Sequence, residues 1–262
     1  MKSVLDRIQQ PGAIRVEFQP IVRVRPDRVE LYAVEALARG PRGTSMERPE
    51  VLFEFARRKG AESNIDMICI TEAFEAYGLL PGQPLLSINV HGATLANIDH
   101  FSDRILSAAK AYGIAPGNLM FEVLEYRAPW AIETFLTTLE LLRGAGVRIA
   151  VDDLGVGASN YQMIVDCHPD YLKVDRHIVN GSSGDRWRRA VLESIATLGR
   201  ACGAIPIAEG VETAADLEVL LDLGIDTVQG WLYARSTPPE ELARGPFFTT
   251  APATQCTKGR CE

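Results

Sequence analysis

The chain has 262 residues and a net charge of −7, with 47% hydrophobic and 23% charged residues. This composition is typical of a globular protein with a sizeable core, and it excludes collagen-like and disordered chains. The negative charge argues against a broad basic surface for duplex nucleic acid, so an anionic ligand would need a local cation.

No apolar run reaches the roughly 18 residues of a membrane-spanning helix, and the N-terminal residues lack the apolar stretch of a signal peptide. We therefore expect a cytoplasmic protein. The five cysteines are odd in number and scattered, which favours reduced thiols over a disulfide framework. Only Cys256 and Cys261 are close together, in a C-terminal tail, 246–262, that we expect to be flexible.

Short apolar runs alternate with helical segments along the chain. The runs predict strands over 18–24, 30–37, 85–90, 119–125, 148–153, 171–175, 204–210 and 227–232. Apolar residues at three- and four-residue spacing, followed by glycine, predict helices over 101–113, 128–146, 185–203 and 214–224. Alternating strands and helices favour a mostly parallel sheet.

Eight such strands predict an α/β fold of the (β/α)8 barrel type, in a single domain over 1–245. Only residues 25–28 separate the first two strands, which is too short for a crossover helix, so one strand runs antiparallel in a hairpin. A doubly wound open sheet is the alternative. It would be expected to carry a G-x-G-x-x-G turn after its first strand, and the sequence has none there.

Polar residues recur at or near the carboxyl ends of the predicted strands. They are Glu35, Asn89, Glu122, Asp152, Asp153, Lys173, Glu209 and Gln229. In a barrel this end is the active-site face, and a ring of acids there needs a shared positive partner. Carboxylate and amide oxygens favour Mg²⁺ or Mn²⁺. The chain has four histidines and none ends a predicted strand, which argues against zinc.

Taken singly, each of these residues has a simpler interpretation. The aspartate pair and Asn89 could be turn residues, and Glu35 could be an exposed strand end paired with Arg39. Lys173 and Asp175 share a strand face and could form a structural ion pair. Glu209 and Glu212 could be a pair at a helix start, which is more plausible for Glu212.

Seven motifs together point to a known family. They are VEALAR (34–39), SINV (87–90), FEVLE (121–125), VDDLGVG (151–157), YLKVDR (171–176), IAEGVET (207–213) and VQGWL (228–232). From about Gln19 to Pro238 the chain closely resembles the EAL-domain cyclic di-GMP phosphodiesterases, which are barrels with one antiparallel strand. One motif alone would be weak evidence, whereas seven in family order are specific.

The resemblance implies a site for two divalent ions, Mg²⁺ or Mn²⁺. The family's ligands to one ion match Glu35, Asn89, Glu122 and Asp152. Asp152 and Asp153 match the ligands to the second ion, so Asp152 would bridge the two. Lys173 matches the lysine that holds the nucleophilic water, Glu209 a carboxylate near that water, and Gln229 an amide close by. Two ions about 3.5–4 Å apart suit hydrolysis by in-line displacement.

The resemblance also implies the ligand and its contacts. Arg39 matches a phosphate-binding arginine, and Gln19 and Leu37 match further ligand-contacting positions. Glu122 and Glu125 point to opposite faces of their strand end, and Glu125 matches the residue that anchors the loop after Asp153. The implied reaction is hydrolysis of cyclic di-GMP to linear pGpG by a homodimer.

The loop after the aspartate pair departs from the family pattern DDFGTGYSS. The positions usually held by Phe, Thr, Tyr and Ser are Leu154, Val156, Ala158 and Asn160. A non-catalytic module that binds cyclic di-GMP or docks a partner is therefore an alternative. A third reading is an unrelated barrel enzyme acting on another phosphodiester or a glycoside, although a glycosidase should show two lone carboxylates.

Overall fold

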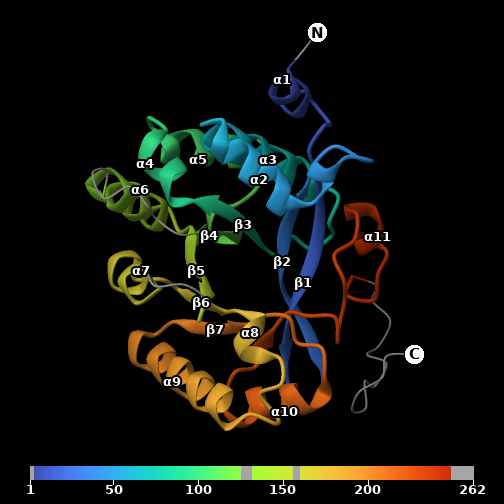
Figure 1. The fold of residues 1–262 in the computed structure, drawn as a ribbon, viewed down its shortest axis with the longest axis vertical. Coiled ribbons are helices and arrows are strands. Elements are labelled where there is room, and N and C mark those ends of the chain that lie inside the picture. The colour runs from blue at the N-terminus through green and yellow to red at the C-terminus, as the bar shows by residue number, and fades with distance from the viewer. Residues whose placement is uncertain (1–2, 125–131, 156–159, 249–262) are drawn as a thin grey trace.

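The computed structural model describes residues 3–124, 132–155 and 160–248 (Figure 1). Eight strands close into a barrel in the order β1 to β8. β1 runs antiparallel to both β2 and β8, and the other neighbouring strands are parallel. The predicted (β/α)8 barrel with one antiparallel strand is confirmed.

The strands occupy most of the predicted runs. Their bounds are β1 Arg15–Val24, β2 Val29–Arg39, β3 Leu85–His91, β4 Leu119–Leu124, β5 Arg148–Leu154, β6 Tyr171–Val174, β7 Ile205–Ala208 and β8 Thr227–Val228. The first two strands form the predicted hairpin around residues 25–28. β8 is much shorter than predicted, because β7 ends at Ala208, which accepts from Gln229 N at 2.8 Å, and the chain turns at Gly230.

Helices surround the barrel (Figure 1). The α-helices are α1 Val4–Ile8, α2 Pro49–Arg58, α3 Glu62–Tyr77, α4 Gly92–Asn97, α5 Phe101–Ala111, α6 Ile132–Gly144, α7 Asn160–Cys167, α8 Arg176–Val179, α9 Arg186–Cys202, α10 Ala214–Asp222 and α11 Pro239–Ala243; short 3-10 turns lie at Ser45–Glu47 (η1) and Pro116–Asn118 (η2). The four predicted helices are α5, α6, α9 and α10. α11 packs beside β1, on the side of the barrel away from α6 and α7 (Figure 1).

One sequence-based statement about histidine is wrong. β3 extends one residue beyond the predicted strand, so His91 ends it. Its Nδ1 lies 2.9 Å from Asp66 Oδ1, and its ring packs against Phe53 at 5.2 Å between centroids. These contacts fasten the strand end to α2 and α3, which places the imidazole with the helices.

The core has an outer layer and an inner plug. The larger cluster fills the space between the outer face of the sheet and the helices. Inside the barrel a smaller cluster forms a plug of Ile21, Ala33, Met120, Ala150, Tyr171 and Ile207. The side chains of a strand alternate between its two faces, so the residue two positions further along shares the inner face. The plug therefore determines which residues line the space above it.

Among the described residues, no helix combines the length and apolarity needed to cross a membrane. The C-terminal cysteines and most of the predicted tail lie outside the described residues. The domain boundary at 245 and the flexibility of the tail stay predictions.

Candidate active site

The candidate site lies directly above the plug, because its charged residues follow plug residues by two positions. Stepping from the plug toward the carboxyl ends of the strands gives Glu35 after Ala33, Glu122 after Met120, Asp152 after Ala150, Lys173 after Tyr171 and Glu209 after Ile207. On the antiparallel strand the same step runs backwards, from Ile21 to Gln19. The structure thus brings the predicted residues to one mouth of the barrel.

Lys173 is the centre of the site and is only 1% exposed. Its Nζ lies 2.5 Å from carboxylate oxygens of both Glu122 and Glu209. It lies 3.5 Å from oxygens of Glu35 and Asp152. Burial alone would lower the pKa of Lys173, but the four surrounding carboxylates outweigh it and raise the pKa well above its ordinary value. Lys173 therefore stays charged.

Glu35 is held by two amides. Asn89 Nδ2 donates to its Oε1 at 2.8 Å, and Gln229 Nε2 donates to its Oε2 at 2.7 Å. Gln229 Nε2 also lies 3.1 Å from Gln19 Oε1. Burial would raise the pKa of Glu35, but the charge of Lys173 and these hydrogen bonds keep it below its ordinary value. Glu35 is therefore ionised. The Asn89 amide binds Glu35 through its nitrogen, so its oxygen remains a candidate ligand for a metal ion.

Glu122 is fully buried beside a residue that the motif analysis did not assign. Ser87 Oγ donates to its Oε1, and Lys173 binds its other oxygen. Burial, followed by the charge of Glu35, raises the pKa of Glu122 well above its usual range. Ser87 is part of the SINV motif, but a serine inside a strand carries no sequence signal for this contact.

Asp152, Asp153 and Glu209 form a second group. Each offers a carboxylate oxygen, and these atoms lie within 4.8 Å of one another. Burial, and then the charges of Asp152 and Glu35, raise the pKa of Glu209 to about 8 despite its contact with Lys173. Asp153 reaches solvent, but partial loss of hydration and the charge of Asp152 raise its pKa to about 6.

The backbone at Asp153 is special. Its φ of 56° is in the left-handed region, which residues other than glycine rarely adopt. The register between β5 and β6 shifts between Val151 and Leu154, so an extra residue bulges out of the ladder here. This bulge turns the Asp153 carboxylate toward the same group as Asp152. Of the altered loop that follows, residues 156–159 lie outside the described residues, as does Glu125.

Arg39 lies at the rim, four residues beyond Glu35 on the same face of β2. Arg39 does not pair with Glu35, so the interpretation of these two residues as an ion pair is wrong. Its Nε donates to Glu17 Oε2 at 2.9 Å, and its Nη2 donates to Ser236 Oγ at 2.8 Å. Leu37 stands beside Glu17 in the strand register, between Glu35 and Arg39. The three predicted ligand-contacting residues, Gln19, Leu37 and Arg39, therefore share one rim.

Two predicted neighbours lie apart from the central cluster. Asp175 makes no ion pair with Lys173; it accepts from His177 N at 2.7 Å and caps α8, because β6 has ended and the chain has turned. Glu212 is exposed ahead of Thr213, which is the residue that caps α10. Neither side chain contacts Lys173, although the charge of Asp175 helps to raise the pKa of Asp153.

The residues present fit divalent cations. Four carboxylates contact one lysine and a fifth, Asp153, lies nearby, and the raised pKa values of Glu122, Glu209 and Asp153 express this excess of negative charge. Among the described residues, the buried Gln229 Oε1 has no hydrogen-bond donor. Oxygen donors with surplus charge are those that Mg²⁺ and Mn²⁺ prefer. The residues that would hold such ions are Glu35, Asn89, Glu122, Asp152 and Asp153.

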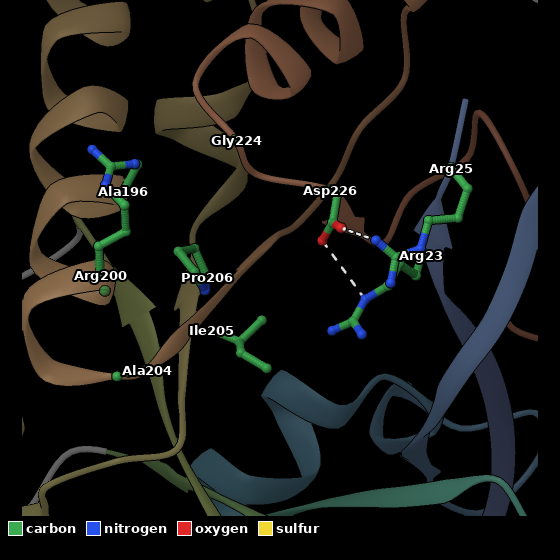
Figure 2. A pocket seen from close by; sticks show the side chains of 11 residues that line it. Arg23, Arg25, Ala196, Arg200, Ala204, Ile205, Pro206, Gly224 and Asp226 are labelled. Carbon is green, nitrogen blue, oxygen red and sulfur yellow. Dashed lines mark hydrogen bonds and ion pairs between the residues drawn. The ribbon is translucent and has the colours of Figure 1, made fainter.

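A separate cavity of about 470 Å³ opens at the other end of the barrel (Figure 2). Figure 2 shows Arg23 and Arg25 on one side, both directed at Asp226, and Arg200 on the other. Arg25 Nη1 lies 3.0 Å from Asp226 Oδ2. The cavity adjoins the carboxyl end of α9, where Arg200 balances the helix dipole and donates to Leu223 O, which follows α10. We assign these arginines to stability, as expected for this end of a barrel.

The fold and the site define a (β/α)8-type barrel with an acidic, lysine-centred mouth at the carboxyl ends of its strands. The model of the EAL domain family matches residues 2–236, and the chain belongs to this family. The resemblance seen in the seven motifs is thereby confirmed.

The chain is similar to proteins named for cyclic di-GMP. It is 34% identical over 237 residues to the probable cyclic di-GMP phosphodiesterase PdeI of Escherichia coli K12, covering 87% of this chain and 29% of PdeI. It also spans only 48% of the length of PdeB from the same organism. The chain therefore covers less than half of each of these two curated relatives.

Solved structures agree with the fold. The manganese and cyclic di-GMP complex of Klebsiella pneumoniae BlrP1 at pH 6 superposes with a TM-score of 0.76 at 28% identity, covering 87% of this chain and 57% of that one. A standalone EAL protein of Vibrio cholerae O395, in its c-di-GMP-bound form, gives 0.74 at 26% identity, covering 88% and 95%.

Proposed function

We propose that the protein is a metal-dependent phosphodiesterase that hydrolyses cyclic di-GMP to linear pGpG. The observation that carries the proposal is the buried Lys173 ammonium, which is in contact with four carboxylates at the barrel mouth. The names and ligands of the similar proteins support this substrate.

In this proposal each part of the mouth has its own task. Bound Mg²⁺ or Mn²⁺, in a pair, would supply Lewis acidity toward the water and the phosphate oxygens. Lys173 Nζ holds the attacking water and offsets phosphate charge, since it stays protonated in this site. Glu209 Oε1 lies 2.5 Å from Lys173 Nζ and, in its ionised form, would receive the proton of that water. Asp152 and Asp153 would hold the cations.

The rim would bind the diester. Arg39 faces the same side of the hairpin as Glu35, so its guanidinium can contact a phosphate above the cations. Gln19 donates to Ala234 O at 3.1 Å and is fixed between Gln229 and the chain after β8. Leu37 supplies an apolar contact between them.

The test is hydrolysis of cyclic di-GMP, with separation of pGpG, in Mg²⁺ or Mn²⁺ and with a chelator. We expect turnover that the chelator abolishes and that Asp152→Asn reduces at least about 100-fold, because the variant removes the bridging charge. Asp166→Asn on α7, which removes a carboxylate away from the mouth, should retain activity. Binding of cyclic di-GMP and metal without product would instead support the non-catalytic module.

We also propose that the protein forms a homodimer through α7. Tyr161 and Val165 lie one turn apart on this helix and are 71% and 63% exposed, which is unusual for large apolar side chains. Light scattering should give the mass of a dimer, and replacing both residues by serine should give a monomer. Trp187→Ser on α9 is the control, and a wild-type monomer at micromolar concentration would contradict the proposal.

A further inference from the structure

Arg39 belongs to a closed set of contacts formed by three separate segments. Its Nε and Nη2 both lie 2.9 Å from Glu17 Oε2, and Nη2 also donates to Ser236 Oγ at 2.8 Å. Ser236 Oγ donates to the same Glu17 oxygen at 2.8 Å. We call Glu17, Arg39 and Ser236 the Arg39 triangle; its members come from β1, β2 and the chain after β8.

The triangle occupies the donors that a phosphate would use. A guanidinium clamps a phosphate through one of two edges, formed by Nε with Nη2 or by Nη1 with Nη2. Both edges include Nη2, which is engaged by Glu17 and Ser236. Nη1 donates to Ala38 O at 3.1 Å. A phosphate can therefore be held by two parallel hydrogen bonds only after a member of the triangle has moved.

Charge makes Glu17 the member that matters most. Ser236 is neutral, and its hydroxyl can turn to donate to a phosphate oxygen. The Glu17 carboxylate can only accept, and it would repel a phosphate placed on the same guanidinium. Its side chain is 25% exposed, so it can turn toward water when displaced.

We propose that Glu17 is a resident counter-ion that competes with the substrate phosphate for Arg39 and so sets the KM of the enzyme. The inference rests on the proposed function, because it takes Arg39 as the phosphate ligand. Glu17 acts through Arg39 and is a positioning residue. It holds the guanidinium at the rim when no substrate is bound, and it weakens phosphate capture.

The two effects of Glu17 can be separated by substitution. Glu17→Gln keeps an oxygen that accepts from Arg39 but removes the charge. We expect its KM for cyclic di-GMP to fall about fivefold with little change in kcat. Glu17→Ala also removes the acceptor, so its KM should lie above that of Glu17→Gln. Glu30→Gln, which removes a carboxylate from the other end of β2, should leave both constants unchanged.

A double-mutant cycle provides the decisive measurement. If Glu17 acts through Arg39, the effect of Glu17→Gln on KM should disappear in an Arg39→Ala background. An unchanged or higher KM in Glu17→Gln would overturn the inference, and so would an equal effect with and without Arg39.

A second probe separates this inference from the proposed function. Bis(4-nitrophenyl) phosphate is a diester without guanine, and its cleavage with Mn²⁺ reports phosphate capture alone. If wild-type protein cleaves this probe but neither binds nor cleaves cyclic di-GMP, the proposed substrate is wrong. In that case a lower KM of Glu17→Gln for the probe would support the inference, and an unchanged KM would overturn it. If neither diester is bound or cleaved, both proposals are overturned.

Discussion

The Nζ atom of Lys173 lies 2.5 Å from Glu209 Oε1, in a site where three further carboxylates surround the same ammonium group. The lysine is almost completely buried, so its charge is screened little by solvent. It is the one cation among the described residues that contacts all four of these acids. The charge balance of the mouth therefore depends on a single side chain.

Replacement of Lys173 by methionine should remove activity and stability together. Methionine has a similar length but leaves the carboxylates without a counter-charge, which costs about 3–5 kcal/mol when a buried ion pair loses one partner. Urea unfolding of the metal-free protein at pH 8 measures the loss. Lys110→Met, an exposed change on α5, should stay within about 0.5 kcal/mol. Equal stability of the two variants would contradict the central role of Lys173.

The metal-free protein should lose stability as the pH rises. Glu209 has a pKa of about 8 in the folded protein against an ordinary value of 4.5, so between these values the unfolded chain releases a proton that the folded chain retains. The stabilisation from the protonated Glu209 is complete below pH 4.5 and is lost progressively as the pH rises to about 8. The Tm in chelator should therefore be lower at pH 8 than at pH 5.5.

Added Mn²⁺ should raise this Tm more at pH 8 than at pH 5.5, since cations compete with protons for the same oxygens. Glu209→Gln should flatten the dependence on pH, whereas Glu193→Gln on α9 should not. A Tm in chelator that does not change between the two pH values would refute the expectation.

Gly230→Ala should destabilise the barrel where the chain after β8 packs against the chain after β7. A Cβ at Gly230 would lie 2.1 Å from Val211 O and 2.3 Å from Val211 N, so the two chain segments must separate. We expect a loss of about 2–3 kcal/mol and lower activity, because Gln229 would be displaced from Glu35. Gly144→Ala at the end of α6 meets open space and should be neutral or stabilising. Similar free energies of unfolding for the two variants would contradict the close approach of Gly230 to Val211.

Asp216 offers a prediction remote from the site. It is 3% exposed and accepts from Ser183 N at 2.9 Å and Thr213 Oγ1 at 2.8 Å. Burial would raise its pKa, but these hydrogen bonds keep the pKa below 3.8. Asp216→Asn should cost about 1–3 kcal/mol at pH 7.

A depressed carboxyl pKa stabilises the fold above the unfolded value, and this contribution is lost as the pH falls through the folded value. The difference between Asp216→Asn and wild type should therefore shrink below pH 4. The exposed Asp222→Asn on the same helix is the control, and a difference independent of pH would show that the charge is not involved.

Features that depend on local sequence could be predicted. The period of the apolar runs placed eight strands, and the short link 25–28 gave the antiparallel hairpin. Helix α3 was not predicted because its sequence shows no clear apolar face: the apolar Ile68 lies away from the buried face, whereas the acidic Asp66 is buried within it. The apolar stripe that marks a surface helix is missing from it.

Contacts between distant segments could not be predicted. Ser87 reaches Glu122 because of the register between β3 and β4, and Ser236 reaches Arg39 across 197 residues. Spacing within a strand gives the face of a side chain but not its neighbour on the next strand. The motifs therefore identified the charged residues, whereas the residues that hold them came from the structure.

The seam of the barrel has a consequence for biosynthesis. β1 pairs with β8 through Val22 and Val228, and Phe18 exchanges backbone hydrogen bonds with Thr237. Of the eight strands of the barrel, β1 is translated first, and its open edge is therefore covered only after β8 has been translated. During that interval Glu35 lacks Gln229, so the acidic mouth is completed only once translation has passed this segment.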